Sequence, residues 1–335
     1  MRRLILTALC VVALGATAFG ATLRVPKDYE TIQDAVDAAE NGDVIVVKKG
    51  TYHESVEIAL REDVTLKAAG KVVIDGGNTL DGLQIGLVEN VTVTGFTILN
   101  AVGPGVRIVG TDGVTVSKCR VEGSGGAGVV IESCRNLRID RCRIESTVGQ
   151  GVLVAEGTGN PASMNCAVTR CRMRETGQTA IQFQTGEAHL AEKNRLEGGE
   201  IYTILVRAPR SVCRKNRISG SENTSVMVDV DEVTVEKNRI DTAGAHGIFV
   251  LGGDCIVAKN RVKEAAEAGI RLQGTGNRAE KNRVGACGFG FQVYGSGNEI
   301  VGNRAKQCLT AVDDFTPQAN LYEKNNFDPP PAMPI

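Results

Sequence analysis

The chain has 335 residues, of which 42% are hydrophobic, and its 38 basic and 39 acidic residues leave a formal net charge of −1. This balance argues against nucleic acid as a partner, because nucleic-acid binding requires a concentrated basic face. Forty glycines, no tryptophan, eight phenylalanines and five tyrosines are typical of a turn-rich β protein with a core of small aliphatic side chains.

The N-terminus has the pattern of a cleaved secretory signal peptide over residues 1–20. Arg2 and Arg3 precede an apolar run over residues 4–14, and Ala18 and Gly20 provide the small residues at a cleavage site. The run is too short to span a membrane, and nothing later in the chain resembles a span. We therefore expect a secreted, periplasmic or cell-surface protein without a membrane anchor, whose net charge after cleavage is near −3.

A short amphipathic helix is predicted over residues 31–40. Ile32, Ala35, Val36 and Ala39 recur at helical spacing, with acidic residues on the opposite face. Asn41 and the glycine after it end the pattern. A solenoid has to protect its open end from water and from pairing with other chains, and we expect residues 28–43 to form such a cap.

One phrase, VTVEKNRI over residues 233–240, recurs through most of the chain. The steps between successive copies are 23, 23, 29, 23, 22, 22, 22, 22, 21 and 22 residues. A fixed period of this size predicts a solenoid, in which each repeat buries its apolar face only against its neighbours. The positions equivalent to Asn238 are Phe96, Cys119, Cys142, Cys171, Asn194, Asn216, Asn260, Asn282, Asn303 and Asn325.

Each repeat contains three short apolar runs. One follows a small residue, as in Gly247-Ile-Phe-Val, the second leads into the asparagine position, and the third follows it. A repeat of about 22 residues has no room for a crossover helix, so the pattern predicts three parallel strands per coil. We expect one all-β domain over residues 21–328, with roughly 10–12 coils beginning near Val64 and a proline-rich tail over 329–335.

The repeated asparagine and the arginine after it have different predicted roles. Asparagine tolerates a left-handed backbone and hydrogen-bonds locally, so we expect it to form the bend between two strands and a ladder from coil to coil. The arginine is expected to point outward beside acidic residues such as Glu122, Glu145, Glu175 and Glu236. We favour the interpretation that these arginines are solvated surface charges over the alternative that they form a stripe that binds anions. These arginines are Arg120, Arg143, Arg172, Arg195, Arg217, Arg239, Arg261, Arg283 and Arg304.

Nine cysteines remain after signal cleavage, so at least one has no partner within the chain. Cys119, Cys142 and Cys171 share one repeat position, and Cys287 and Cys308 share another. We interpret them as small buried hydrophobic residues stacked in a ladder. No Cys-x-x-Cys pair indicates a metal site.

These features resemble the right-handed parallel β-helix proteins of the pectate-lyase-like superfamily. The opening TIQDAVDAAENGDVIVVKKGTYHESVEI is similar to the N-terminal segment of exported members such as pectin methylesterases and alginate epimerases. The catalytic signatures of the superfamily are mostly missing. Only His246 with Gly247 is similar to the Gly-His-Gly of polygalacturonases, and Asp313-Asp314 follows in the wrong order.

The resemblance implies that a site would lie on the outer face of the strand that follows the small residue. Polar residues gather there between Gln182 and Tyr294, and acidic polysaccharide is the expected partner. Removing a proton beside a uronate carboxylate requires a base, His246 or Tyr294, and a cation, Arg271 or Arg207. The predicted catalytic residues are His246, Arg271 and Tyr294, and the predicted substrate-binding residues are Gln182, Gln184, Arg207, Asp229, Gln273 and Gln292.

Other interpretations of this face stay open. Asp229 and Asp231 would offer oxygens to calcium if they share a strand face, although no other cofactor is expected. All of these side chains are otherwise ordinary exposed β residues. The apolar Leu205, Met227, Phe249 and Leu251 interrupt the polar cluster and would be covered by a partner or by a projecting loop around residues 157–164.

Three functional classes follow. We favour polysaccharide binding, with lyase or epimerase activity left open. The alternative is a non-catalytic structural or cell-surface scaffold, although aromatic platforms for sugars are scarce. A periplasmic accessory protein, similar to the β-helix proteins of nitrous-oxide reductase copper maturation, would require methionine or histidine clusters, and five methionines with three histidines do not provide them.

Overall fold

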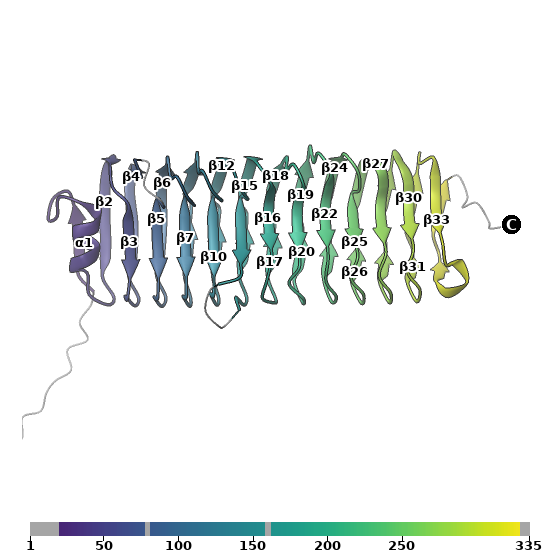
Figure 1. Cartoon of the computed structure of the whole chain (residues 1–335), viewed down its shortest axis with the longest axis horizontal. Helices are drawn as coiled ribbons and strands as arrows, with labels where there is room; N and C mark the ends of the chain where they lie inside the picture. Colours follow the sequence, from purple (N-terminus) through teal and green to yellow (C-terminus); the bar gives the residue numbers. More distant parts are fainter. Residues whose placement is uncertain (1–19, 78–80, 158–161, 329–335) are drawn as a thin grey trace, which may run out of the picture.

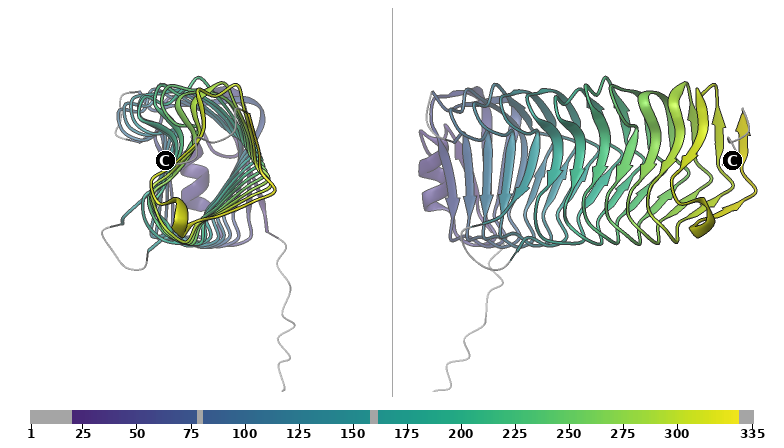
Figure 2. Two further views of the ribbon diagram at one scale, coloured as in Figure 1. Left: turned by 90° about the vertical axis from the view of Figure 1, so that its right-hand side faces the viewer. Right: turned by 45° about the vertical axis from the view of Figure 1, so that its right-hand side comes forward.

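The computed structural model describes residues 20–77, 81–157 and 162–328, which form a long solenoid (Figure 1). Most of the predicted signal peptide, the proline-rich tail and part of the predicted loop at 157–164 lie outside these residues. Seen end-on, the coils superimpose into a three-sided outline (Figure 2). The strand pairs between neighbouring coils are parallel, as in β22 with β25 and in β23 with β26.

The first face, which we call the site sheet, is made of the strands that follow the small residue of each coil. Its neighbours pair in order from β3 to β33. Its strands are β3 (Val56–Ala59), β5 (Leu83–Gly86), β7 (Val106–Val109), β10 (Val129–Glu132), β13 (Val152–Ala155), β16 (Thr179–Phe183), β19 (Tyr202–Val206), β22 (Thr224–Val228), β25 (Ile248–Val250), the end of β27 (Arg261–Leu272), β30 (Cys287–Val293) and β33 (Thr310–Asp314).

The second face, the second sheet, leads into the asparagine position. Its strands are β1 (Thr22–Val25), the first parts of β2 (Val44–Tyr52), β4 (Thr65–Asp75) and β6 (Thr92–Leu99), and β8 (Thr115–Ser117), β11 (Arg138–Asp140), β14 (Ala167–Thr169), β17 (Leu190–Glu192), β20 (Val212–Arg214), β23 (Thr234–Glu236), β26 (Ile256–Ala258), β28 (Arg278–Glu280), β31 (Glu299–Val301) and β34 (Leu321–Glu323). These fourteen strands exceed the 10–12 coils predicted, because β1 and β2 precede the predicted start of the coils near Val64.

The third face, the arginine sheet, begins after the asparagine position. Its strands are the second parts of β2, β4 and β6, then β9 (Arg120–Glu122), β12 (Arg143–Thr147), β15 (Arg172–Thr176), β18 (Arg195–Glu197), β21 (Arg217–Ser219), β24 (Arg239–Ala243), the beginning of β27, β29 (Arg283–Gly285), β32 (Arg304–Lys306) and β35 (Asn326–Asp328). One 3-10 turn, η1 (Pro317–Ala319), follows β33.

The core consists of columns of apolar side chains that repeat from coil to coil. Val226, Ile248, Ile270 and Phe291 occupy matching positions on adjacent site-sheet strands, and none of them is accessible to solvent. Burying one such side chain stabilises the fold by about 1.5–3 kcal/mol. The alternation of inward and outward side chains therefore fixes which residues of each strand reach the outer surface.

The predicted helix is present as α1 (Ile32–Ala38) and covers the first coil. Thr31 caps it by accepting a hydrogen bond from the Asp34 backbone N–H at 3.0 Å. The carboxylate of Glu54 accepts hydrogen bonds from two other backbone N–H groups of the first turn, those of Ile32 and Gln33, at 3.0 and 2.9 Å. None of the helices in the part of the chain that the structure describes is long and apolar enough to cross a membrane.

The asparagine ladder is confirmed from Asn194 to Asn325. The Nδ2 of Asn216 donates to Oδ1 of Asn238 at 3.0 Å, and Asn238 donates to Asn260 at the same distance. Each Oδ1 also accepts the backbone N–H of the preceding asparagine, so buried polar groups are satisfied by identical neighbours.

The prediction that asparagine itself takes the left-handed backbone is wrong. The residue before it does so: Lys215, Lys237 and Lys259 have φ angles of 56°, 54° and 58°. Because the lysine makes the bend, the asparagine keeps an ordinary backbone and turns its amide into the interior, where it is buried.

All nine cysteines of the described residues are buried free thiols, as predicted. Cys142 donates its thiol to the Val116 carbonyl of the preceding coil at 3.6 Å. Burial raises the pKa of Cys213 to about 12, and the hydrogen bond with Cys142 together with burial raises the pKa of Cys119 well above its ordinary value. Cys119 and Cys213 are therefore protonated parts of the core.

Candidate functional site

The outer face of the site sheet carries two columns of side chains. In the first, Leu205, Met227, Phe249, Arg271, Gln292 and Asp313 lie side by side on successive strands. In the second, Gln184, Arg207, Asp229, Leu251, Gln273, Tyr294 and Phe315 lie just beyond the strand ends. The predicted outward positions thus do face away from the core.

Four of the predicted binding residues form one hydrogen-bonded chain. Gln182 donates to Gln184 at 2.7 Å, Arg207 donates to Gln184 at 3.1 Å, and Arg207 pairs with Asp229 at 3.0 Å. Gln150 extends the chain by donating to Gln182 at 3.2 Å. This chain offers amide and guanidinium donors along three successive strands, but the charge of Arg207 is already balanced by Asp229.

Arg271 has a different environment, because its guanidinium lies between two aromatic rings. The guanidinium carbon is 4.7 Å from the ring centroid of Phe249 and 4.7 Å from that of Tyr294. Tyr294 in turn stacks on Phe315, with centroids 4.2 Å apart and planes 9° from parallel. No carboxylate of the described residues forms an ion pair with Arg271, and its buried Nε has no hydrogen-bond partner among them.

The sequence-based prediction missed this aromatic row. Phe249, Tyr294 and Phe315 come from coils up to three repeats apart, and only the strand register brings them together. The sequence pattern predicts Phe249 as an apolar interruption of the polar cluster, yet its ring forms one side of the Arg271 stack. Phe315 is 56% exposed, so part of the row is open to solvent.

His246 lies beside Arg271 and is only 6% exposed. Its Nδ1 accepts the backbone N–H of Ala268 at 3.3 Å. A neutral imidazole that accepts at Nδ1 carries its proton on Nε2. That nitrogen lies 3.4 Å from Glu267 and 3.4 Å from Nη1 of Arg271.

Burial lowers the pKa of His246, the Arg271 charge lowers it further, and the Glu267 carboxylate opposes both. The side chain is therefore neutral at neutral pH, with no free lone pair facing outward. This geometry gives no support to the role of His246 as a base, which stays a prediction, and no hydrogen bond within the described chain links it to the Tyr294 hydroxyl.

The remaining predicted residues are less tightly grouped. Gln292 is mostly buried and donates to Asp313 at 3.3 Å. Gln273 is exposed beyond the end of β27, and its side chain makes no hydrogen bond to another described residue. The polar group around Arg207 ends at Asp229 beside β22, and β25, with Phe249 and Leu251, separates it from Arg271 on β27.

Leu205 and Met227 are only 4% and 6% exposed although they face outward. These two side chains therefore present little apolar surface, whereas Phe249 and Leu251 are half-buried, and a loop or partner as their cover stays a prediction. A calcium site at Asp229 and Asp231 is also not supported. The strand β22 ends at Val228, so the two carboxylates do not share a strand face, and Asp231 instead accepts the Gly253 N–H at 2.6 Å.

Within the described ranges, no group of three or more His, Cys, Asp or Glu side chains is arranged to hold a metal ion. A second acidic position, Asp314, is used structurally. It accepts hydrogen bonds from the Thr316 N–H at 2.7 Å and from the Tyr322 hydroxyl at 2.5 Å. This network fixes the turn that carries Phe315.

A sequence family described as "Right handed beta helix region" matches residues 51–166 and 159–305. No curated protein sequence matches the chain. Among solved structures, the catalytic domain of a GH87 α-1,3-glucanase in complex with tetrasaccharides has a TM-score of 0.73 at 11% identity, covering 93% of this chain and 70% of that one.

Two further structures have related folds. The surface adhesin PfbA of Streptococcus pneumoniae has a TM-score of 0.65 at 14% identity and covers 91% of each chain. The A-module of the Azotobacter vinelandii mannuronan C-5 epimerase AlgE6 has a TM-score of 0.68 at 15% identity, covering 91% of this chain and 95% of that one. At these identities the similarity is one of fold.

Proposed function

The chain belongs to the right-handed β-helix family, and from that premise we propose that it binds an acidic polysaccharide lengthwise along the outer face of the site sheet. The observation that carries the proposal is the environment of Arg271, a guanidinium held between Phe249 and Tyr294 without a carboxylate partner in the described chain. A uronate carboxylate would supply that partner, and a guanidinium binds carboxylates through paired hydrogen bonds.

The aromatic row supports a sugar as the rest of the ligand. Exposed aromatic faces and edges provide apolar contact for the C–H groups of sugar rings, while amides such as Gln273 provide hydrogen bonds for hydroxyls. From Gln182 to Phe315 the face crosses seven strands, and the six steps between them, at about 4.8 Å each, make a track of about 29 Å. A track of that length accommodates several sugar units of a polymer.

The names of the related structures agree with a carbohydrate ligand. One is a glucanase bound to tetrasaccharides and another is a mannuronan epimerase, which acts on a uronate polymer. The pneumococcal structure is a surface adhesin, so the same fold also serves binding at a cell surface. These comparisons support the ligand class, and the charge of the polymer is inferred from Arg271 alone.

We propose binding without proton abstraction. His246 has its Nδ1 occupied by the Ala268 N–H and its proton on Nε2, so it lacks the lone pair that a lyase or epimerase base requires. In the proposal His246 packs beside Arg271 and directs its Nε2–H at Glu267. Wild-type protein is expected to give no unsaturated product and no change of uronate configuration on polygalacturonate or alginate. A product that disappears in His246→Ala would contradict this assignment.

The binding proposal is tested by calorimetry with polygalacturonate and alginate, using neutral dextran for comparison. We expect Arg271→Gln to weaken uronate binding by roughly tenfold, because a charge-assisted hydrogen bond is replaced by a neutral one. The matched control is Arg138→Gln, which removes the same charge from an exposed arginine on β11 of the second sheet. Equal weakening by both variants would show that binding follows net charge and not the Arg271 stack.

A further inference from the structure

The arginine sheet carries nine arginines in register, and the first six are paired with carboxylates. The acid lies two residues after an arginine and binds that arginine together with the one a coil earlier, so Arg172 and Arg217, which have no such acid of their own, pair with the acid of the next coil. Glu197 pairs with Arg195 at 3.1 Å and Arg172 at 3.3 Å, and Asp241 pairs with Arg239 at 2.9 Å and Arg217 at 3.3 Å. In the same way, Glu145 pairs with Arg143 and Arg120.

The last three arginines of the column are not paired with an acid of their own coil or of the next coil within the described residues. Arg261, Arg283 and Arg304 occupy matching positions on β27, β29 and β32. The residues two positions after them are Lys263, Gly285 and Lys306. All three arginines are exposed, and none forms an ion pair with a residue of the described ranges. The predicted arrangement of an outward arginine beside an acid therefore holds for six coils, although Glu145 is buried, and the last three coils differ.

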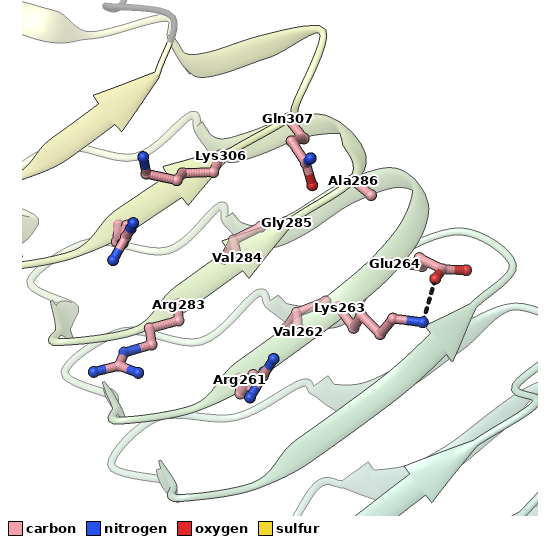
Figure 3. Close-up of a pocket in the computed structure, with 11 residues that line it drawn as sticks. Arg261, Val262, Lys263, Glu264, Arg283, Val284, Gly285, Ala286, Lys306 and Gln307 are labelled. Atoms are coloured by element: carbon pink, nitrogen blue, oxygen red, sulfur yellow. Dashed lines mark ion pairs between the residues drawn. The ribbon is translucent and has the colours of Figure 1, made fainter.

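These residues surround a hollow of about 440 Å³ (Figure 3). Five cationic side chains and one carboxylate, Glu264, line it. Glu264 pairs with Lys263 at 2.7 Å and lies across the hollow from Arg261 and Arg283. The only other carboxylate near the lysines is Asp328, which lies 3.8 Å from Lys306 within the described chain.

The absence of a side chain at Gly285 opens the hollow, although the fold does not require glycine there. A Cβ at this position would come no closer than 3.5 Å to any atom, and the residue does not have a left-handed backbone. Upstream coils place Glu122 and Glu197 at the equivalent position. An acid at this position would neutralise Arg283 and Arg261 as Glu197 neutralises its two arginines.

We propose that Arg261, Arg283, Arg304 and Lys306 form a second binding site, which takes the oxyanion groups of a sulfated or carboxylated polysaccharide. Arginines on successive strands present guanidinium groups about every 4.8 Å, so the site is suited to a polymer with regularly spaced charges. The site lies on the arginine sheet and does not depend on the Arg271 stack of the site sheet.

The lining favours a glycan over single-stranded nucleic acid. Single-stranded nucleic acids are held by aromatic side chains on which the bases stack. No residue that lines the described hollow is aromatic. The chain as a whole also has a net charge of −1, which disfavours a long polyanion except where the cations are concentrated.

The test uses the purified full chain carrying Arg271→Gln, so that the site sheet contributes little. Dextran sulfate, polygalacturonate and neutral dextran are the probes, and binding is followed by calorimetry at two salt concentrations. We expect Gly285→Glu to weaken binding of the better anionic probe at least tenfold, and Gly285→Gln, which fills the same space without charge, less than threefold. Arg217→Gln, in the same column but paired with Asp241, is expected to change binding less than threefold.

The anionic probe that binds more tightly identifies sulfate or carboxylate as the preferred group. The site is supported whichever probe that is, provided that the three variants change its binding by the expected factors. Three results would overturn it: unchanged binding in Gly285→Glu, equal losses in Gly285→Gln and Gly285→Glu, or an equal loss in Arg217→Gln. Tighter binding of a single-stranded oligonucleotide than of both glycans would also contradict it. Thermal unfolding of Gly285→Glu checks that the variant is folded.

Discussion

The guanidinium carbon of Arg271 and the ring of Tyr294 lie 4.7 Å apart on adjacent strands of the site sheet. Phe249 holds the other side of the guanidinium and His246 reaches its Nη1 at 3.4 Å. Contact with an aromatic face stabilises a cation without neutralising it, so Arg271 keeps its charge for a ligand. The protonation state of His246, beside Arg271, then determines whether the site has a base for proton abstraction.

We predict that His246 is neutral at pH 7 and carries its proton on Nε2. The reason is the hydrogen bond from the Ala268 N–H to Nδ1, together with the burial that lowers the pKa of His246. Nitrogen chemical shifts from long-range proton–nitrogen correlation spectra distinguish the two tautomers. A proton on Nδ1, or a pKa above that of a free histidine, would contradict the structure and would restore a base at this position.

The asparagine ladder is expected to be a major source of stability. Asn238→Ala removes four hydrogen bonds, two of which leave the Asn216 backbone N–H and one of its two amide N–H groups without an acceptor. Since an unsatisfied buried polar group costs about 1–3 kcal/mol, we expect a loss of about 3 kcal/mol in the free energy of unfolding in urea. Asn326→Ala, at an exposed position of β35, serves as the control and should cost less than about 0.5 kcal/mol.

The buried carboxylate of Glu145 is predicted to make stability depend on acidic pH. Burial alone would raise its pKa, but the hydrogen bond from Arg143 and the charges of Arg143, Arg174 and Arg120 lower it overall. The folded state therefore favours the ionised form, and its contribution is present above the unfolded pKa and lost as the pH falls through the folded one.

At pH 7 we expect Glu145→Gln to lower the free energy of unfolding by about 2 kcal/mol, since the side chain is 1% exposed and contacts three arginines. Urea titrations at pH 7 and pH 3 should show this difference shrinking at the lower pH. Glu175→Gln, whose side chain is 63% exposed, is the matched control with little expected effect. A difference that grows on acidification would contradict the assignment.

A second pH dependence is expected from His189, which is buried at a turn of the solenoid. Its Nδ1 accepts the Cys166 N–H at 3.2 Å, its Nε2 faces the Thr185 carbonyl at 2.9 Å, and burial lowers its pKa to about 4. The folded state binds the proton less readily than the unfolded state. Stability is therefore complete above the unfolded pKa of about 6.5 and falls by up to about 3 kcal/mol as the pH drops to 4.

His189→Asn should remove this dependence while keeping the turn intact. Asn277 occupies the equivalent position and accepts the Cys255 N–H at 2.8 Å, so asparagine fits there. The measurement is the urea unfolding midpoint between pH 7 and pH 4. The control is His53→Asn, because the His53 side chain is 74% exposed, and it should leave the dependence unchanged. A slope that persists in His189→Asn would place its origin elsewhere.

The sequence predicted the solenoid and the direction of most side chains, because a period near 22 residues and alternation within each strand are local signals. It assigned the bend to Asn238 when the left-handed residue is Lys237, since both residue types occur at turns and only the backbone distinguishes them. It also placed Glu145 among solvated charges. The carboxylate is buried because arginines from three coils converge on it.

The site was harder to predict than the fold. Arg271 and Tyr294 were recognised as functional candidates, but the contribution of Phe249 and Phe315 depends on the register between four strands. The basic hollow depends on which acids are missing from a column, as at Gly285, and a missing partner is recognisable only once the partners of the other coils are known.

The most direct test of the account is a crystal structure of the wild-type protein with a bound oligogalacturonate or oligomannuronate. We predict that a uronate carboxylate accepts hydrogen bonds from Arg271 and that a neighbouring sugar ring contacts Tyr294 or Phe315 on the site sheet. An oligosaccharide bound on another face, with Arg271 left free, would contradict the central claim.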